Sequence, residues 1–196
     1  MKRTIAVFDF DGTLTRRDTL LEFIRYACGL KRFFCGFMLY APILLMMKVK
    51  LYPNWKAKQK IFSHFFKGMD YSEFLKLGAD FSDVVESFRR NDTIGLLEKH
   101  VREGHTVYVV SASIDEWVRP WCCRLGVTGV LSTKIEVDSR GCITGRFLTK
   151  NCYGQEKVNR LLEAEPHRDE YFLYAYGDSR GDKEMLEFAD EGKYVL

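Results

Sequence analysis

Short apolar runs, each followed by a polar residue, recur along the chain. They cover residues 5–8, 106–110 and 171–176, and Asp9, Ser111 and Gly177-Asp178 follow them. A continuous apolar run of this length is typical of a parallel strand that is buried on both faces. Helical patterns over residues 92–103 and 115–125, each followed by a glycine, flank the second run. The alternation predicts an open α/β sheet whose ligand site lies at the carboxyl ends of the strands.

Two segments depart from this alternation. Residues 134–147 alternate with period two around a glycine-containing turn, which predicts a β-hairpin inserted in the core. Residues 16–88 contain no convincing strand but show helical periodicity, so we expect a helical insertion after the first strand. The chain is therefore predicted to consist of a catalytic core, residues 1–15 and 89–196, and a cap, residues 16–88.

An uncharged stretch at residues 33–47 lies inside the predicted cap. It is shorter than the ~20 residues that a membrane-spanning helix needs, and Pro42 is expected to interrupt a continuous helix. Two interpretations stay open. The stretch forms either the buried interior of the cap or a lipid-facing surface, which would be flanked by the basic residues Lys31, Arg32, Lys48 and Lys50.

Composition and charge narrow the classes of protein. With 46% hydrophobic and 29% charged residues, the chain is typical of a folded globular protein. A net charge of +3 is too small to indicate nucleic acid as the main partner. The six cysteines form no CxxC pair, and the N-terminus lacks the pattern of a signal peptide. We therefore expect reduced thiols in a cytoplasmic protein, with peripheral contact at the inner face of the membrane left open.

The first strand is followed by two aspartates in a glycine-containing turn, Asp9-Phe10-Asp11-Gly12-Thr13. Side chains at i and i+2 of an extended segment point the same way, so Asp9 and Asp11 are expected to face one reacting atom. One carboxylate can then attack phosphorus as a nucleophile while the other donates a proton to the leaving group. A capped turn after a strand would use the same residue types without any chemistry.

Three further motifs supply the other parts of a phosphoryl-transfer site. Ser111 and Ala112 offer a hydroxyl and backbone N–H groups to phosphoryl oxygens. Lys157, on a helix after Gly154, can neutralise both the nucleophile and the transferring group. Asp178 and Asp182 offer hard oxygen atoms to Mg²⁺, Asp178 as a direct ligand and Asp182 through a water or by fixing Lys157. Their order after apolar strands favours a shared site.

Together these motifs resemble those of the haloacid dehalogenase superfamily phosphatases, over nearly the whole chain. The resemblance implies a Rossmann-like three-layer core with a C1 cap, and a Mg²⁺ cofactor. It implies Asp9 as nucleophile and Asp11 as acid and then base. Ser111 and Lys157 would contact the phosphate, and the Mg²⁺ site would comprise Asp9, the Asp11 backbone carbonyl, Asp178 and Asp182.

The substrate is expected to be a phosphorylated small molecule or a lipid headgroup. The chain resembles the phosphoserine phosphatase group, but Asp18 stands where that group has a glutamate and Ala112-Ser113 stands where it has two glycines. The uncharged stretch in the cap is similar to relatives that act on phosphatidylglycerophosphate, so a bulky or lipid-linked phosphate is the favoured hypothesis. A small-metabolite phosphatase, a phosphotransferase and a non-catalytic membrane-associated phosphate-binding module are the alternatives.

Overall fold

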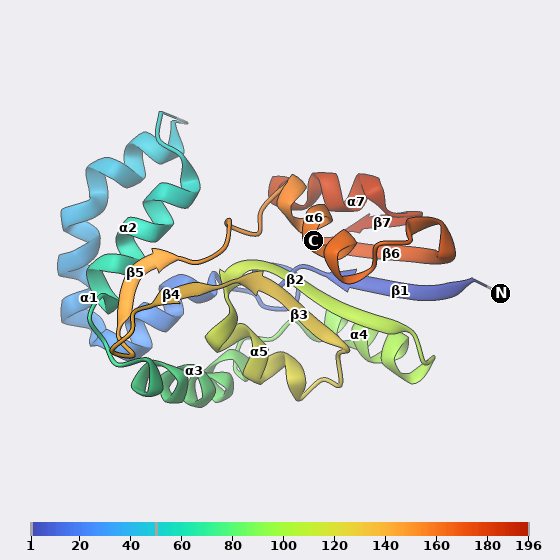
Figure 1. Ribbon diagram of the computed structural model, residues 1–196, viewed down its shortest axis with the longest axis horizontal. Coiled ribbons are helices and arrows are strands. Elements are labelled where there is room, and N and C mark those ends of the chain that lie inside the picture. The colour runs from blue at the N-terminus through green and yellow to red at the C-terminus, as the bar shows by residue number, and fades with distance from the viewer. Residues whose placement is uncertain (1, 50, 196) are drawn as a thin grey trace.

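The computed structural model describes residues 2–49 and 51–195, and a five-stranded parallel sheet lies at its centre (Figure 1). The strands are β1 (Arg3–Phe8), β2 (Thr106–Ile114), β3 (Gly129–Thr133), β6 (Tyr171–Gly177) and β7 (Glu191–Tyr194), in the order β3-β2-β1-β6-β7. The three apolar runs of the sequence thus form the three central strands. The α/β prediction is confirmed.

Helices cover both faces of this sheet and make the fold three-layered (Figure 1). On one face lie α4 (Asn91–Arg102) and α5 (Asp115–Cys123), and on the other lie α6 (Gln155–Ala164) and α7 (Lys183–Phe188). Alternate side chains of β1 point to opposite faces of the sheet and pack with the two helical layers. Ala6 and Phe8 pack with α4 and α5, whereas Ile5 and Val7 pack with α6 and α7. This division explains why residues 5–8 of β1 are all apolar and buried.

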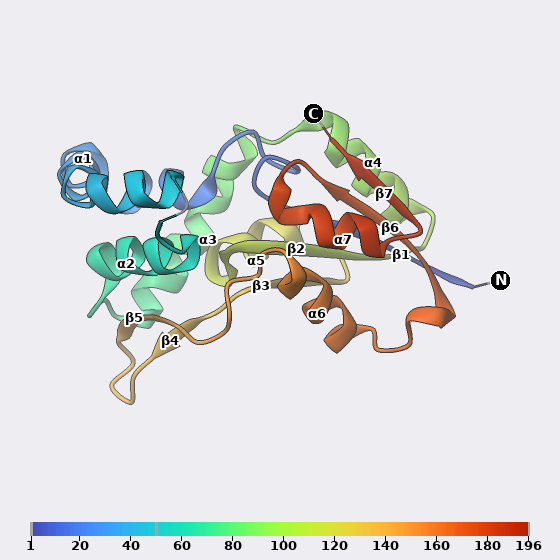
Figure 2. The same cartoon turned by 90° about the horizontal axis from the view of Figure 1, so that it is seen from above.

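A helical body lies between β1 and α4 in the chain and extends from one end of the sheet (Figure 2). It consists of α1 (Thr19–Lys48), α2 (Asn54–Phe66) and α3 (Tyr71–Glu86). Its aromatic interior reaches the core, because Phe23 stacks on Trp117 of α5 with ring centroids 4.5 Å apart. Gly78 of α3 also lies so close to the backbone of Glu116 that a side chain at this position would collide with it.

The predicted hairpin forms from β4 (Ile135–Val137) and β5 (Ile143–Phe147), but it packs against the helical body. Ile143 exchanges backbone hydrogen bonds of 2.8 and 2.9 Å with Gly68 and Met69, which follow α2. The Phe147 backbone N–H donates to Gln59 of α2 at 3.0 Å. The sequence position of the hairpin, within the core, therefore does not reveal which body it contacts.

Helix α1 does not break at Pro42, contrary to the expectation from the sequence. The helix continues through Pro42, and its non-helical backbone lies at Gly29, where φ is 75°. Pro42 is exposed, as is Met38, so the carbonyl group that proline leaves without a partner can be solvated. By length and mean hydropathy α1 could cross a membrane. One of its sides nevertheless packs closely, because Gly36 lies against the ring of Phe65 in α2.

Candidate active site

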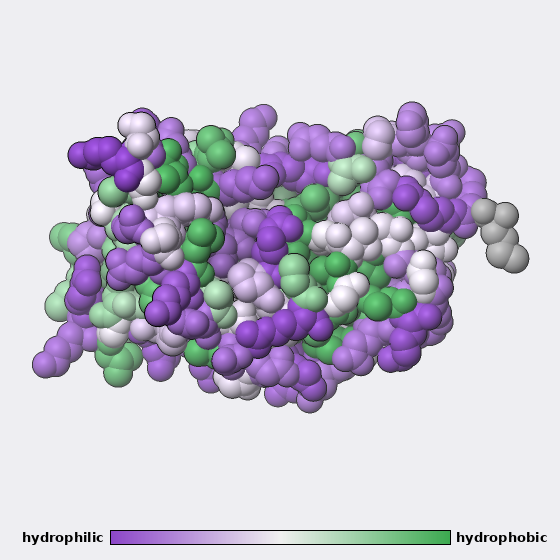
Figure 3. Space-filling model, turned by 60° about the horizontal axis from the view of Figure 1, so that its bottom comes forward, coloured by the Kyte–Doolittle hydropathy of each residue, from purple (hydrophilic) through white to green (hydrophobic). Residues whose placement is uncertain are grey.

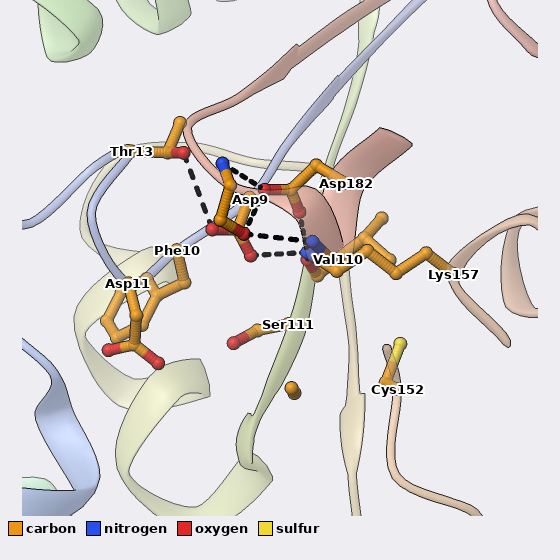
Figure 4. A network of polar contacts seen from close by, with 12 residues as sticks. Asp9, Phe10, Asp11, Thr13, Val110, Ser111, Cys152, Lys157 and Asp182 are labelled. Carbon is orange, nitrogen blue, oxygen red and sulfur yellow. Dashed lines mark hydrogen bonds and ion pairs between the residues drawn. The ribbon is translucent and has the colours of Figure 1, made fainter. Parts of the chain in front are cut away.

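Asp9 stands at the carboxyl end of β1 and is buried. Its backbone N–H donates to the carbonyl of Tyr176 in β6 at 2.9 Å, which continues the strand pairing by one residue. From the other face of the sheet, Lys157 of α6 reaches the same point and is 2% exposed. Its ammonium forms an ion pair with Asp9 and one of 2.6 Å with Asp182, and it donates to the Val110 carbonyl at 3.0 Å (Figure 4).

The pKa values of both partners of this ion pair are raised, but for different reasons. Burial, offset only in part by Lys157, raises the pKa of Asp9 to about 7, and the nearby Asp182 adds to the rise. Burial also acts to lower the pKa of Lys157, but Asp9 and Asp182 outweigh it, so that pKa lies above its usual value. Lys157 has two carboxylate partners and stays charged. Asp9 has one ammonium and a competing carboxylate, so its ionised form needs further positive charge.

Three carboxylates surround the position where that charge would lie. One oxygen each of Asp9, Asp178 and Asp182 lies within 4.8 Å of the others. With Lys157 protonated and all three carboxylates ionised, the group carries a net charge of −2. Burial, followed by the charge of Asp182, raises the pKa of Asp178. An all-oxygen donor set with this charge fits a hard divalent cation such as Mg²⁺.

Gly12 and Thr13 hold the turn after Asp9 against Asp178. Gly12 has a φ of +84°, and a Cβ at this position would collide with the Asp178 carboxylate. Glycine is therefore required both by the backbone conformation and by the space. The Thr13 hydroxyl lies 3.4 Å from an oxygen of Asp9 and 3.3 Å from one of Asp178, so it spans the two carboxylates.

Asp182 has a structural role as well as its contact with Lys157. Its carboxylate accepts the backbone N–H groups of Ser179 at 3.0 Å and Asp178 at 3.3 Å, and the Ser179 hydroxyl at 2.8 Å. These bonds close a capping box on the short 3₁₀ turn Arg180–Asp182 that precedes α7. The sequence left open whether Asp182 acts through a metal-bound water or by fixing Lys157, and in the structure it contacts Lys157 and also caps this turn.

The side chain of Asp11 does not point to the same atom as that of Asp9 (Figure 4). Its carboxylate accepts the backbone N–H of Thr19 at 2.8 Å and the hydroxyl groups of Thr19, at 2.6 Å, and Ser113. Strand β1 ends at Phe8, so the i, i+2 alternation does not continue through the turn. Burial, followed by the charge of Asp18, raises the pKa of Asp11, which suits a proton donor.

A cavity of about 170 Å³ lies between these core residues and the helical body. Asp9, Asp11, Lys157 and Asp182 line it from the core side, and Lys58 of α2 lines it from the helical body. Sequence reasoning missed Lys58, because a lysine on a helix carries no signal by itself. It also missed Tyr153, which lines the cavity just before α6, and the Thr19 and Ser113 partners of Asp11.

Other residues that the sequence singled out take different positions. Ala112 lines the cavity, whereas Ser111 is fully buried and its hydroxyl accepts the backbone N–H of Ser113 at 3.0 Å. Asp18 lines the cavity and also caps α1, accepting the N–H groups of Leu20 at 3.0 Å and Leu21 at 3.3 Å. Among the described residues, none from 33 to 47 lines this cavity.

Known proteins resemble the chain over most of its length. The model of the haloacid dehalogenase-like hydrolase family matches residues 6–187. Protein CicA of Caulobacter vibrioides is 31% identical over 193 residues, which are 98% of this chain and 86% of that protein. Phosphoserine phosphatase SerB1 of Mycobacterium tuberculosis is 30% identical over 192 residues, 92% of this chain and 61% of that protein.

The fold has a counterpart among solved structures. The structure of a protein of unknown function from Bordetella pertussis Tohama I has a TM-score of 0.83 at 19% identity, and the match covers 95% of this chain and 87% of that one. At this identity the likeness supports the fold alone. Because the family model spans all four motifs, and Asp9, Lys157 and Asp182 from these motifs line one cavity, this chain belongs to the haloacid dehalogenase-like hydrolase family.

Proposed function

We propose that this haloacid dehalogenase-like phosphatase hydrolyses phosphomonoesters with Mg²⁺ through an aspartyl-phosphate formed on Asp9. The observation that carries the proposal is the group of Asp9, Asp178 and Asp182, in which Asp9 and Asp182 are buried and form ion pairs with Lys157. Asp9, Asp178 and Asp182 would hold the cation, with the Asp11 backbone carbonyl as the family resemblance implies. Bound Mg²⁺ would neutralise charge on the phosphoryl oxygens and favour ionised Asp9.

The reaction would proceed in two steps. A carboxylate oxygen of Asp9 attacks phosphorus, the bond from phosphorus to the leaving oxygen breaks, and Asp11 gives that oxygen its proton. Water then attacks phosphorus, Asp11 takes a proton from the water, and the bond to Asp9 breaks to release inorganic phosphate. Lys157 stabilises the charge that develops on the transferring group. Ser111 and the backbone of Ala112 would contact the same group.

The test is turnover of an aryl phosphate by Asp9→Asn, measured with Mg²⁺ and with a chelator. Asn is close in shape but is not a carboxylate nucleophile, so we expect a loss of several orders of magnitude. Asp169→Asn is the matched control, because Asp169 is exposed and lies in the 3₁₀ turn Arg168–Glu170, away from the cavity. Near-native turnover by a folded Asp9→Asn variant would rule out the covalent route.

A lipid-linked phosphomonoester remains our proposal for the substrate, with residues 16–88 acting as the cap. The supporting observation is the charge distribution. Between Glu22 and Asp70 the sequence has nine basic residues and no acidic residue, whereas elsewhere the 27 acidic residues outnumber the 21 basic ones. Such a segment is attracted to anionic lipid. Lys58, a member of it, lines the catalytic cavity and offers a cation to a second acidic group on the substrate.

We also propose that α1 and α2 contact the membrane surface. Large apolar side chains of the outer part of α1 are exposed, among them Leu30, Phe34, Met38, Leu39 and Leu45, and hydrophobic residues reach the surface at this end of the molecule (Figure 3). Lys31, Arg32 and Lys48 flank them, while Lys50 lies outside the described residues. An apolar face between cations is typical of a helix that lies in the lipid interface.

Vesicle sedimentation tests this contact. Binding to vesicles with anionic lipid should exceed binding to neutral vesicles, should weaken with salt and should fall for Lys31→Glu with Arg32→Glu. Lys99→Glu with Arg102→Glu on α4 is the control. Equal binding of all variants, or no binding at low salt, would show that this surface does not contact the membrane and would favour the small-metabolite phosphatase.

Product analysis with an added alcohol separates hydrolysis from phosphotransfer. The absence of any turnover would favour the non-catalytic module.

A further inference from the structure

A second, larger cavity lies beside the catalytic one. Its volume is about 750 Å³, and it lies between the start of α2 and the connection from β5 to α6. Asn54, Trp55 and Gln59 line it from the helical body, and residues 147–151 with Tyr153 and Glu156 line it from the other side. Figures 1 and 2 show this connection running from the hairpin beside α2 to the catalytic core.

The wall of this groove exposes large apolar side chains. Trp55 is 46% exposed, Leu148 64% and Tyr153 43%, and Phe147 contributes a further ring. These residues come from segments about 90 positions apart in the chain, yet they face one space. An apolar concave surface with a few polar groups is typical of a site that binds the apolar part of a small molecule.

Tyr153 connects the groove to the catalytic cavity, because it lines both. Its ring lies against Gly181, so closely that a Cβ on Gly181 would collide with it. Gly181 itself lines the catalytic cavity. The ring therefore marks the boundary, with Lys157 and Asp182 on one side and Trp55 and Leu148 on the other. A phosphoryl group at Asp9 would have its ester substituent close to the entrance of the groove.

We propose that this groove binds the alkyl or acyl chain of the leaving alcohol. The inference rests on the proposed function for the position of the phosphate and adds where the rest of the substrate lies. It also assigns the apolar contacts with the substrate to different residues. Residues 33–47 do not line the catalytic cavity, whereas the groove is lined by Trp55, Phe147, Leu148 and Tyr153. The groove has room for a chain of several methylene groups, whereas a small polar alcohol would leave it to water.

Trp55 provides a direct measurement of binding. The other two tryptophans, Trp117 and Trp121, are fully buried, so Trp55 is the tryptophan that acrylamide can quench most readily. Octylphosphonate, which cannot be hydrolysed, should shift the emission to the blue and protect Trp55 from acrylamide. Ethylphosphonate should do neither. The shift should be absent in Trp55→Phe and should need a several-fold higher concentration in Leu148→Asn.

Kinetics with n-alkyl phosphates give the second measurement. We expect kcat/KM to rise from ethyl to octyl phosphate, by at most about fourfold for each methylene group that is fully buried. Leu148→Asn should lower the octyl-to-ethyl ratio of kcat/KM several-fold. Leu75→Asn, an exposed leucine on α3, should leave that ratio unchanged.

The two proposals fail in different ways. If octylphosphonate inhibits aryl phosphate hydrolysis without protecting Trp55, or if kcat/KM does not depend on chain length, the groove is not the chain site, although the phosphatase chemistry stands. If octylphosphonate protects Trp55 but Asp9→Asn keeps full turnover, the groove stands and the covalent mechanism falls. A fall of equal size for ethyl and octyl phosphate in Leu148→Asn would also overturn the inference.

Discussion

Replacing Lys157 with methionine tests how the buried charges of the site are balanced. Lys157 is 2% and Asp182 1% exposed, and Asp9 is also buried. Lys157→Met keeps most of the side-chain volume but changes the net charge of the three carboxylates and the lysine from −2 to −3. Breaking a buried ion pair by removing one partner costs about 3–5 kcal/mol, because it leaves uncompensated buried charge. That is a large part of the roughly 5–15 kcal/mol that stabilises a typical domain.

Urea unfolding followed by far-ultraviolet circular dichroism measures the difference. Lys99→Met, at an exposed lysine with a 3.8 Å pair to Glu103, is the control and should change stability by no more than about 0.5 kcal/mol. Saturating Mg²⁺ should restore part of the loss, since a ligand that binds only the folded state stabilises it by about 2.7 kcal/mol at 100 times its Kd.

The deficit should also depend on pH. The pKa of Asp9 in the folded protein, about 7, lies above the value of roughly 3.9 expected in the unfolded chain. Removing Lys157 raises it further, so near and above pH 7 the folded variant binds more protons than the folded wild type, and the deficit in stability should grow as pH rises through about 7. A Lys157→Met protein as stable as the wild type, or a deficit that shrinks as pH rises, would refute this account of the site.

Three other changes have defined outcomes. Asp11→Asn should slow alkyl phosphates more than aryl phosphates, whose leaving oxygen needs less protonation, and equal losses would contradict the acid role. Gly12→Ala should displace Asp178 and strain the turn. The Mg²⁺ concentration for half-maximal activity should then rise about tenfold or more, which corresponds to a loss of about 1.4 kcal/mol of binding free energy. Gly95→Ala, in open space on α4, should leave that concentration unchanged. Burial, with His105 adding to it, lowers the pKa of His100. The unfolded chain therefore binds more protons, stability should fall as pH drops below about 6.5, and thermal unfolding of His100→Gln, compared with His167→Gln, should show a weaker fall.

The parts of the fold that were predictable from sequence have strong local patterns. The three central strands contain the apolar runs 5–8, 106–110 and 171–176 because both faces of the sheet are covered, and a residue singled out for the site follows each run. Strand β7, Glu191–Tyr194, was not predictable in the same way, because it lies at the sheet edge and its residues are exposed. The helical nature of residues 16–88 was visible, but which side of α1 would face solvent was not.

The site was predictable in its residues but not in all its contacts. Asp9 and Asp178 meet because the parallel strands β1 and β6 bring their carboxyl ends to one edge, which follows from topology, and Lys157 and Asp182 join them from α6 and the turn before α7. The orientation of Asp11 depends on Thr19, the first residue of α1, and no local pattern shows that contact. The position of Lys58 in the catalytic cavity and the groove at Trp55 likewise depend on how α2 packs opposite the β5–α6 connection, which no local sequence pattern shows.

The kink at Gly29 gives α1 two parts with different mechanical roles. The inner part begins at Thr19, which binds Asp11, and carries Phe23, which stacks on Trp117 of the core. The outer part has an exposed apolar face. Because the joint separates them, residues on the exposed side of the outer part can change to suit a new surface while the contacts of Thr19 and Phe23 stay fixed, as long as the side that packs on α2 at Gly36 is kept. The same catalytic core could in this way act at a different cellular surface without any change to its chemistry.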